Sequence, residues 1–141
     1  MTPKEILHVW FEGVWNQSDR KAIDRYLAEP CEVHGLAHEP IRTRNDMKAF
    51  FDQMNAVLDD IHIDVDHCIE SGNTVAFVFT VNGVHKATGN RFSQKNAGFG
   101  TVESSQIVYV VNVVDFLSMF MQTGVLPADA IQQGLSAGRI A

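Results

Sequence analysis

Several features that would point to particular classes of protein are missing from this sequence of 141 residues. No apolar run is long enough to span a bilayer, and the N-terminus lacks the basic and then apolar segments of a signal peptide. Lys and Arg number only 11 against 17 Asp and Glu, which leaves a net charge of −6 and no basic cluster. We therefore expect a cytoplasmic protein with neither a membrane nor nucleic acid as a partner.

Cysteine is equally scarce, since Cys31 and Cys68 are the only two, and both fall within predicted strands. Two reduced thiols are therefore expected, not a disulfide framework. Cys31, His34 and His38 lie close in sequence, but a strand and a loop give them no fixed geometry and no fourth ligand is evident, so no metal is expected. The sequence also lacks a Gly-rich phosphate loop and a nucleophile elbow, and we expect no cofactor.

The composition suits one domain, residues 1–141, because 45% of the residues are hydrophobic and 20% are charged. Thr2 and Glu5 have the spacing of a capping box, and Thr43 can cap a later helix. Apolar residues recur with the helical period after both signals. These patterns predict helices over residues 4 to 17, 19 to 28 and 44 to 58.

Period-two alternation and β-branched runs predict strands over residues 31 to 36, 61 to 70, 74 to 85, 98 to 103 and 106 to 114. Ser71, Gly72 and Asn73 indicate a hairpin turn, and Ser104 with Ser105 a second tight turn. The polar residues 86 to 96 are interpreted as a loop or an irregular strand edge.

The pattern of hydrophobic residues changes at Asp115, near the end of the chain. The buried strand before it gives way to helical spacing over residues 116 to 123, and Gly124 with Pro127 ends that helix. Asp115 is either a chemical group or simply the N-cap of the helix. Residues 128 to 141 have weak periodicity, so a short helix followed by fraying is expected.

Helices grouped before hairpin-connected strands predict an α+β fold with an antiparallel sheet. Two strands are apolar on both faces, whereas the helices can cover only one face of the sheet. The other face is predicted to meet a second copy in a homodimer. The residues expected at that interface are apolar and lie on neighbouring strands: Ala76, Val78, Val108, Val110 and Val114.

Four segments in this order resemble the SnoaL-like polyketide cyclase and ester cyclase family: WFEGVWNQSD, CEVHG, IESGNTVAFVFTVNGVH and NVVDFLSMFMQTGVLP. The resemblance extends from about Ile6 to Pro127. It implies the cone-shaped fold of the nuclear transport factor 2-like superfamily, in which three N-terminal helices pack into a strongly curved antiparallel sheet and a short C-terminal helix follows. That superfamily contains enzymes and non-catalytic binders alike, so the resemblance leaves the reaction open.

The same resemblance implies roles for two residues. Cyclases of this family use a carboxylate at the end of the last strand as general acid and base in an intramolecular aldol ring closure, and Asp115 matches it. Family members often place a histidine after a glycine and a small residue, which corresponds to His85 here. The segment KATGNRFSQKN is shorter than the loop typical of ester cyclases, and Val111 stands where an aromatic residue is common, so the substrate is left open.

Strand parity places Tyr109 and Asp115 on one face, and Phe77, Phe79 and His85 on one face of the neighbouring hairpin. If these faces line the cone, a carboxylate and an imidazole share an apolar cavity, which suits general acid–base chemistry. Tyr109, or Asn112 if the strand is bulged, would hold an enolate oxygen. The expected pocket residues are Trp15, Met54, Phe77, Phe79, His85, Tyr109 and Asp115, with His34 as a further substrate-binding candidate.

Two functions follow from these expectations. The first is a cofactor-independent cyclase-like lyase or isomerase that acts on a small hydrophobic carbonyl compound such as a polyketide. The alternative is a non-catalytic dimeric module that binds a small ligand. Two of the candidate site residues also have explanations that involve no function. His85 can be a solvated residue at the end of a strand, and His34 can be a core or edge residue whose hydrogen bonds are satisfied.

Overall fold

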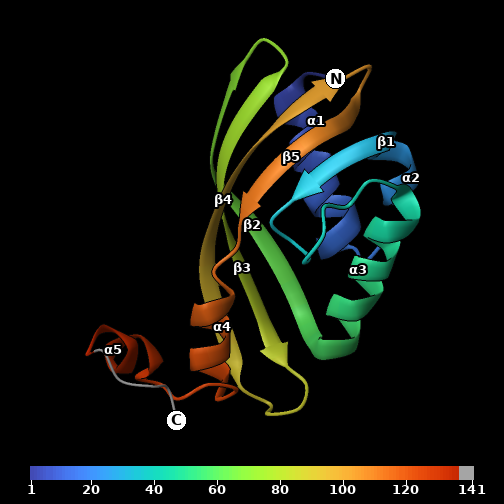
Figure 1. The fold of residues 1–141 in the computed structure, drawn as a ribbon. Helices are drawn as coiled ribbons and strands as arrows, with labels where there is room; N and C mark the ends of the chain where they lie inside the picture. The colour runs from blue at the N-terminus through green and yellow to red at the C-terminus, as the bar shows by residue number, and fades with distance from the viewer. Residues whose placement is uncertain (137–141) are drawn as a thin grey trace.

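The computed structural model describes residues 1–136, which form a strongly curved five-stranded sheet with helices packed into its concave side (Figure 1). The strand order is β1-β5-β4-β3-β2. The strands are β1 (Leu27–His34), β2 (Leu58–Ser71), β3 (Thr74–His85), β4 (Arg91–Glu103) and β5 (Gln106–Val113). The helices are α1 (Pro3–Trp10), η1 (Phe11–Asn16), α2 (Ala22–Tyr26), α3 (Arg44–Val57), α4 (Phe116–Thr123) and α5 (Ala130–Leu135).

The capping signals of the sequence act as predicted. Thr2 and Glu5 form a reciprocal capping box at the start of α1, and the Thr43 hydroxyl accepts a hydrogen bond from the main-chain N–H of Asp46 over 3.0 Å. The first helix does not keep the α-helical pattern to its end, because α1 passes directly into the π-helical turn η1. Asn16 then ties η1 to β2 through bonds of 2.6 and 2.9 Å to the main chain of Ile63.

The prediction of a purely antiparallel sheet is wrong at one edge. The second helix ends early, at Tyr26, because Leu27 already begins β1. That strand pairs with β5 in parallel, and the other three strand pairs are antiparallel as predicted. A parallel partner is possible here because α3 and the whole meander separate β1 from β5 along the chain. The α+β class and the cone-shaped fold are confirmed.

Strand β4 begins at Arg91, so the interpretation of residues 86 to 96 as a loop or irregular edge is wrong for most of that segment. Its inward residues Phe92, Gln94 and Asn96 are buried, whereas Arg91, Ser93 and Lys95, which alternate with them, are exposed. Two of the three inward side chains are polar. The period of two was therefore hidden from a reading based on hydrophobicity.

β-Bulges change which face several strand residues occupy. The pairing register of β5 against β4 passes from Tyr109 directly to Ile107, so Val108 has no partner and the alternation shifts by one residue. Val110 and Val114 consequently line the inside of the cone, and their predicted place on the outer face is wrong. A similar irregularity in β2 between Val65 and His67 turns Ile69 outwards, where it is 71% exposed.

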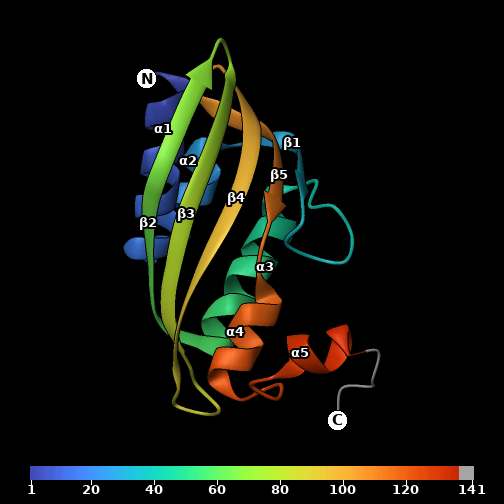
Figure 2. The ribbon, with the colours of Figure 1, turned by 90° about the vertical axis from the view of Figure 1, so that its left-hand side faces the viewer.

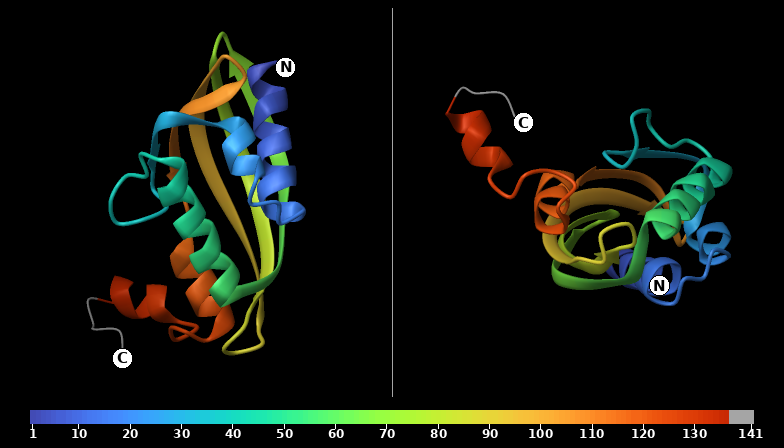
Figure 3. Two further views of the ribbon diagram at one scale, coloured as in Figure 1. Left: turned by 90° about the vertical axis from the view of Figure 1, so that its right-hand side faces the viewer. Right: turned by 90° about the horizontal axis from the view of Figure 1, so that it is seen from below.

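The helices close one side of the cone and leave the other side of the sheet uncovered. Helices α1, α2 and α3 lie across the concave face, as the view onto the right-hand side of Figure 1 and the view from below show (Figure 3). The convex face of β2, β3, β4 and β5 carries no helix (Figure 2). The main core therefore lies between the helices and the concave face.

The described part of the chain ends with two short helices, as predicted for residues 116 to 123 and for the start of the tail. Helix α4 packs beside β4, and α5 projects away from the cone (Figure 1). The predicted fraying of the last residues falls on residues 137–141, outside the described part. Within residues 1–136, no helix combines the length and the apolar character needed to cross a membrane.

Candidate functional site

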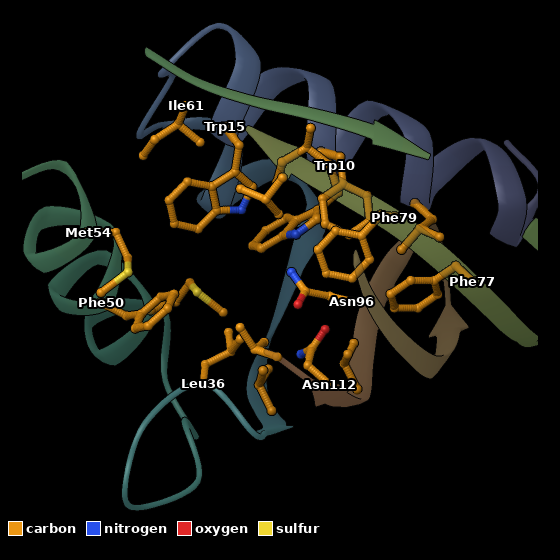
Figure 4. A pocket seen from close by; sticks show the side chains of 18 of the residues that line it. Trp10, Trp15, Leu36, Phe50, Met54, Ile61, Phe77, Phe79, Asn96 and Asn112 are labelled. Atoms are coloured by element: carbon orange, nitrogen blue, oxygen red, sulfur yellow. The ribbon is translucent and has the colours of Figure 1, made fainter. Parts of the chain in front are cut away.

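A cavity lies inside the cone, between the concave face of the sheet and the helices that cross it (Figure 4). The space open to the centre of a water molecule is about 100 Å³. Helices α1, η1, α3 and α4 contribute one part of its wall, and residues of all five strands contribute the other. The cavity is the natural place for a small ligand, because such sites are concave, mostly apolar and preformed.

Aromatic rings form much of the wall. Phe11 and Phe79 lie 4.8 Å apart between ring centroids, and Phe77 lies 5.8 Å from each of them. On the opposite side, the edge of Trp15 meets Phe50 at 6.0 Å. These rings pack on one another as well as on the cavity, so the wall is held in place without a ligand.

Three amide side chains interrupt this apolar wall: Gln94, Asn96 and Asn112. Gln94 and Asn96 are two residues apart on β4, and each is only 4% exposed. Asn112 lies on β5 opposite Gly98, which is two residues beyond Asn96. The lining residues of the described chain include no acid, base or thiol. The polar character of the cavity is therefore that of uncharged amides.

Main-chain groups hold two of the three amides. The Oδ1 of Asn96 accepts a hydrogen bond from the main-chain N–H of Asp115 over 2.8 Å. The Nδ2 of Asn112 donates to the main-chain carbonyl of His34 over 3.4 Å. The Oε1 of Gln94 is buried, and no donor in residues 1–136 bonds to it. A buried polar atom in this state is costly unless something else pairs with it.

The eight site residues predicted from sequence fall into two groups of four. Trp15, Met54, Phe77 and Phe79 line the cavity. His34, His85, Tyr109 and Asp115 lie outside its lining. The predicted pairing of an acid and a histidine inside the cavity is not what the structure has. The roles assigned to these residues stay predictions.

Asp115 is the N-cap of α4. Its Oδ1 accepts a hydrogen bond from the main-chain N–H of Ser118 over 2.9 Å, and its side chain is exposed. The bulge in β5 explains its position, because Val114 and Phe116 on either side of it line the cavity instead. The capping alternative for Asp115 is therefore present in the structure.

His85 lies at the far end of β3, opposite Leu58 on β2. Its main-chain N–H donates to the carbonyl of Asn90 over 2.9 Å, and its Nδ1 is buried with no bonding partner in residues 1–136. Parity alone placed this ring with Phe77 and Phe79. The cavity wall on β3 nevertheless ends at Val81, four residues earlier.

Tyr109 and His34 lie together on the outer side of the β1–β5 edge. Their ring centroids are 5.7 Å apart, and Phe99 on β4 meets Tyr109 at 6.1 Å. His34 also has its Nε2 3.7 Å from a carboxylate oxygen of Glu32. The bulge that turns Tyr109 outwards turns Asn112 inwards, which is the alternative that the sequence had left open for a bulged strand.

Gln94 and Asn96 were missed by the sequence reading. They lay in a segment interpreted as a loop, because their polarity concealed the strand. The signal that could have found them is the alternation of Phe92, Gln94 and Asn96 with the exposed Ser93 and Lys95. Amides at every second position after a buried aromatic residue indicate a strand with a polar inner face.

No group of three or more His, Cys, Asp or Glu side chains within residues 1–136 is placed to hold a metal ion. Cys31 is buried, and its Sγ donates to the carbonyl of Ile41 over 3.9 Å. Burial, and to a lesser extent the Glu29 and Asp46 carboxylates, raise the pKa of the Cys31 thiol to about 11. Such a thiol stays protonated and is a poor ligand and nucleophile.

The curved sheet, the helices across its concave face and the internal cavity define the class of cone-shaped α+β proteins. The sequence matches the SnoaL-like domain over residues 7–110, and the chain belongs to this family. No curated protein sequence matched it.

Solved structures with this fold are similar over nearly their whole length. A protein with a ketosteroid isomerase-like fold from Catenulispora acidiphila, solved with trimethylamine, has a TM-score of 0.79 at 19% identity and covers 92% of this chain and 98% of its own. A putative polyketide cyclase from Streptomyces antibioticus has a TM-score of 0.78 at 22% identity, covering 88% and 99%. A putative hydroxylase from Streptomyces galilaeus has a TM-score of 0.76 at 17% identity, covering 89% and 97%. At these identities the likeness establishes the fold.

Proposed function

We propose that this protein has a cyclase-like role and binds a small, uncharged, mainly apolar carbonyl compound in the cavity of the cone. The observation that carries the proposal is the wall itself, in which aromatic and aliphatic side chains surround three amides and no charged group. A charged ligand would lose its hydration there without gaining a counter-ion. An apolar compound with an oxygen atom suits the same wall, because its body replaces water and its oxygen meets the amides.

The amides supply a chemical reason for a carbonyl ligand. An Asn or Gln side chain that donates to a carbonyl oxygen also stabilises the negative charge that grows on that oxygen when a proton leaves the neighbouring carbon. Membership of the SnoaL-like family supports a cyclase-like role in general, and the similar protein from Streptomyces antibioticus is described as a putative polyketide cyclase. A reaction of this kind needs no cofactor.

Asp115 is our candidate for the general acid and base of that reaction. Its carboxylate is one residue from Val114 and one from Phe116, both of which line the cavity, and its main-chain N–H is bonded to Asn96. His85, with a buried Nδ1 that no described residue bonds, is the second candidate.

The non-catalytic alternative is that the same cavity only binds its ligand. The observation in its favour is that the Asp115 carboxylate already caps α4 and is exposed. Catalysis and binding make the same demand on the cavity, so ligand binding is tested first.

Binding is measured with the uncharged fluorescent probe N-phenyl-1-naphthylamine, followed by displacement with 2-tetralone or 1-indanone. We expect saturable fluorescence that the ketones reverse. The variant Val81→Phe puts a larger side chain into the wall and should abolish the signal. Val84→Phe is the matched control, because Val84 lies on the same strand outside the lining and should leave binding intact. Equal binding by Val81→Phe and the wild type would place the ligand elsewhere and refute the proposal.

A further inference from the structure

The orientation of two cavity amides is determined by main-chain atoms. A main-chain N–H can only donate, so the atom of Asn96 that meets Asp115 N at 2.8 Å must be its oxygen. A main-chain carbonyl can only accept, so the atom of Asn112 that meets His34 O at 3.4 Å must be its nitrogen. Asn96 therefore keeps its Nδ2 as a donor, and Asn112 keeps its Oδ1 as an acceptor.

These two atoms are available in the same part of the cavity. The amides of Asn96 and Asn112 lie close together on neighbouring strands, with their oxygens on the facing sides and the Asn96 nitrogen directed further into the cavity (Figure 4). No hydrogen bond joins them, and no other group within residues 1–136 bonds to Asn96 Nδ2 or Asn112 Oδ1. Gly98 faces Asn112 across the strand pair and adds no side chain between them.

The packing around position 98 requires a glycine. A Cβ at this position would lie 2.7 Å from the Phe77 ring and 2.7 Å from the carbonyl oxygen of Val111. Both distances are shorter than real contacts allow. A side chain is therefore excluded at this point of the wall, because the Phe77 ring and the Val111 carbonyl already occupy the space that it would need.

Gln94 makes this part of the wall richer in acceptors. Its buried Oε1 lacks a donor, and it lies two residues from Asn96 on the same face of β4. If its amide is turned over, a buried N–H takes the place of that oxygen, so the group seeks a partner in either orientation.

We infer that Asn96 and Asn112 form a hydroxyl-recognition site for an uncharged apolar ligand, that is, an alcohol, enol or phenol. A hydroxyl oxygen accepts a hydrogen bond from Asn96 Nδ2, and its hydrogen is donated to Asn112 Oδ1. A ligand that presents only a ketone or ether oxygen to these amides satisfies the Asn96 donor and leaves Asn112 Oδ1 without a partner, which weakens binding. The proposed carbonyl compound is therefore expected to carry a hydroxyl or enol group as well. A ligand that is an anion in its resting state is disfavoured, because Asn112 Oδ1 would repel it and the lining within residues 1–136 includes no cation.

This inference rests on the proposed cavity binding and makes the ligand class narrower. Ligands of one shape that differ at a single polar group are needed to test it: 2-naphthol, which donates and accepts; 2-methoxynaphthalene, which only accepts; and naphthalene, which does neither. Affinities are measured by competition with N-phenyl-1-naphthylamine at pH 7, where the naphthol is uncharged. We expect 2-naphthol to bind roughly tenfold more tightly than 2-methoxynaphthalene.

The variant Asn112→Leu removes the acceptor and keeps the approximate size of the side chain. The preference for naphthol over the methyl ether should then fall to about onefold, while the ether binds as tightly as before. Asn82→Leu is the matched control, because Asn82 is a half-buried amide on β3 outside the cavity lining, and it should keep the preference.

The wild-type comparison does not depend on any variant folding correctly. If all three compounds bind and the naphthol shows no preference, the hydroxyl site is wrong and the cavity proposal stands. A preference that survives in Asn112→Leu also refutes the hydroxyl site. If none of the compounds binds, the cavity proposal fails, and the hydroxyl site fails with it.

Discussion

The main-chain N–H of Asp115 donates to the side-chain oxygen of Asn96 over 2.8 Å, and this bond joins the start of α4 to the wall of the cavity. The Oδ1 atom of Asn96 is thus hydrogen-bonded within the protein, and its Nδ2 atom is left to donate to a ligand. The residue that the family resemblance made the catalytic candidate and the residue that the structure places in the wall are direct neighbours. Substitutions of Asp115 therefore test capping and chemistry, and a substitution of Asn96 tests the hydrogen bond that joins α4 to the cavity wall.

At Asp115, the variants Asp115→Asn and Asp115→Ala separate capping from chemistry. Asn caps a helix about as well as Asp, so Asp115→Asn should keep the free energy of unfolding, whereas Asp115→Ala should lose about 1 kcal/mol because the Ser118 N–H loses its acceptor. Urea denaturation measures both. If Asp115 is the base, exchange of the ketone's α-hydrogens for deuterium is lost in both variants.

A control for this experiment is Thr43→Ala, which removes the cap of α3 at a similar cost in stability and should leave exchange unchanged. Wild-type exchange in Asp115→Asn would show that Asp115 only caps α4. The binding function would then be the better description of the protein.

At Asn96, the variant Asn96→Leu should destabilise the protein by roughly 1–3 kcal/mol, because the main-chain N–H of Asp115 loses its partner. The same substitution at Asn82, which lies outside the cavity wall and for which the structure shows no side-chain hydrogen bond, should cost less. Urea denaturation with a constant slope gives both values. A smaller loss at Asn96 than at Asn82 would contradict the structural role of this bond.

Cys31 predicts a dependence of stability on pH. Its pKa is raised in the folded protein to about 11 from an ordinary value of 9.0, so the folded state favours the neutral thiol. That stabilisation is complete below pH 9 and is lost as the pH rises toward 11, where the unfolded chain has already released its proton. The stability advantage of the wild type over Cys31→Ala should narrow across this range.

The matched control is Val33→Ala, which also removes buried apolar volume from β1 but no thiol. Its difference in unfolding free energy from the wild type should stay constant between pH 9 and 11. A constant difference for Cys31→Ala as well would mean that the thiol is not shielded from water.

We propose that the convex face of the sheet forms a homodimer interface. Val113 on β5 is 70% exposed and Phe99 on β4 is 44% exposed, and no helix covers this face. Light scattering at micromolar concentration should give twice the chain mass, and Val113→Asp should give the monomer, because a buried charge without a partner is costly. Leu117→Asp, at an exposed apolar position on α4, is the control and should remain dimeric. A monomeric wild type would refute the interface.

Local chemistry in the sequence determined where most elements begin and end. The capping pairs of Thr2 with Glu5 and of Thr43 with Asp46, the turn at Gly72 and the switch from strand to helix at Asp115 are all present in the structure. Each of these signals acts over three or four residues, and for that reason a single sequence is sufficient to read it.

Trp15, Met54, Phe77 and Phe79 could be assigned to the cavity from the sequence, but its polar side chains were decided by the tertiary structure. A bulge at Val108 arises from the pairing of β5 with β4, and it exchanges Tyr109 for Asn112 at the wall without any local mark in the sequence. Gln94 and Asn96 face inwards because the register of β4 against β3 places them opposite Val81 and Phe79, which line the cavity, although their polarity argues for an exposed position. Which side chains share a cavity depends on the register between strands that are distant in the chain, and local periodicity does not contain that register.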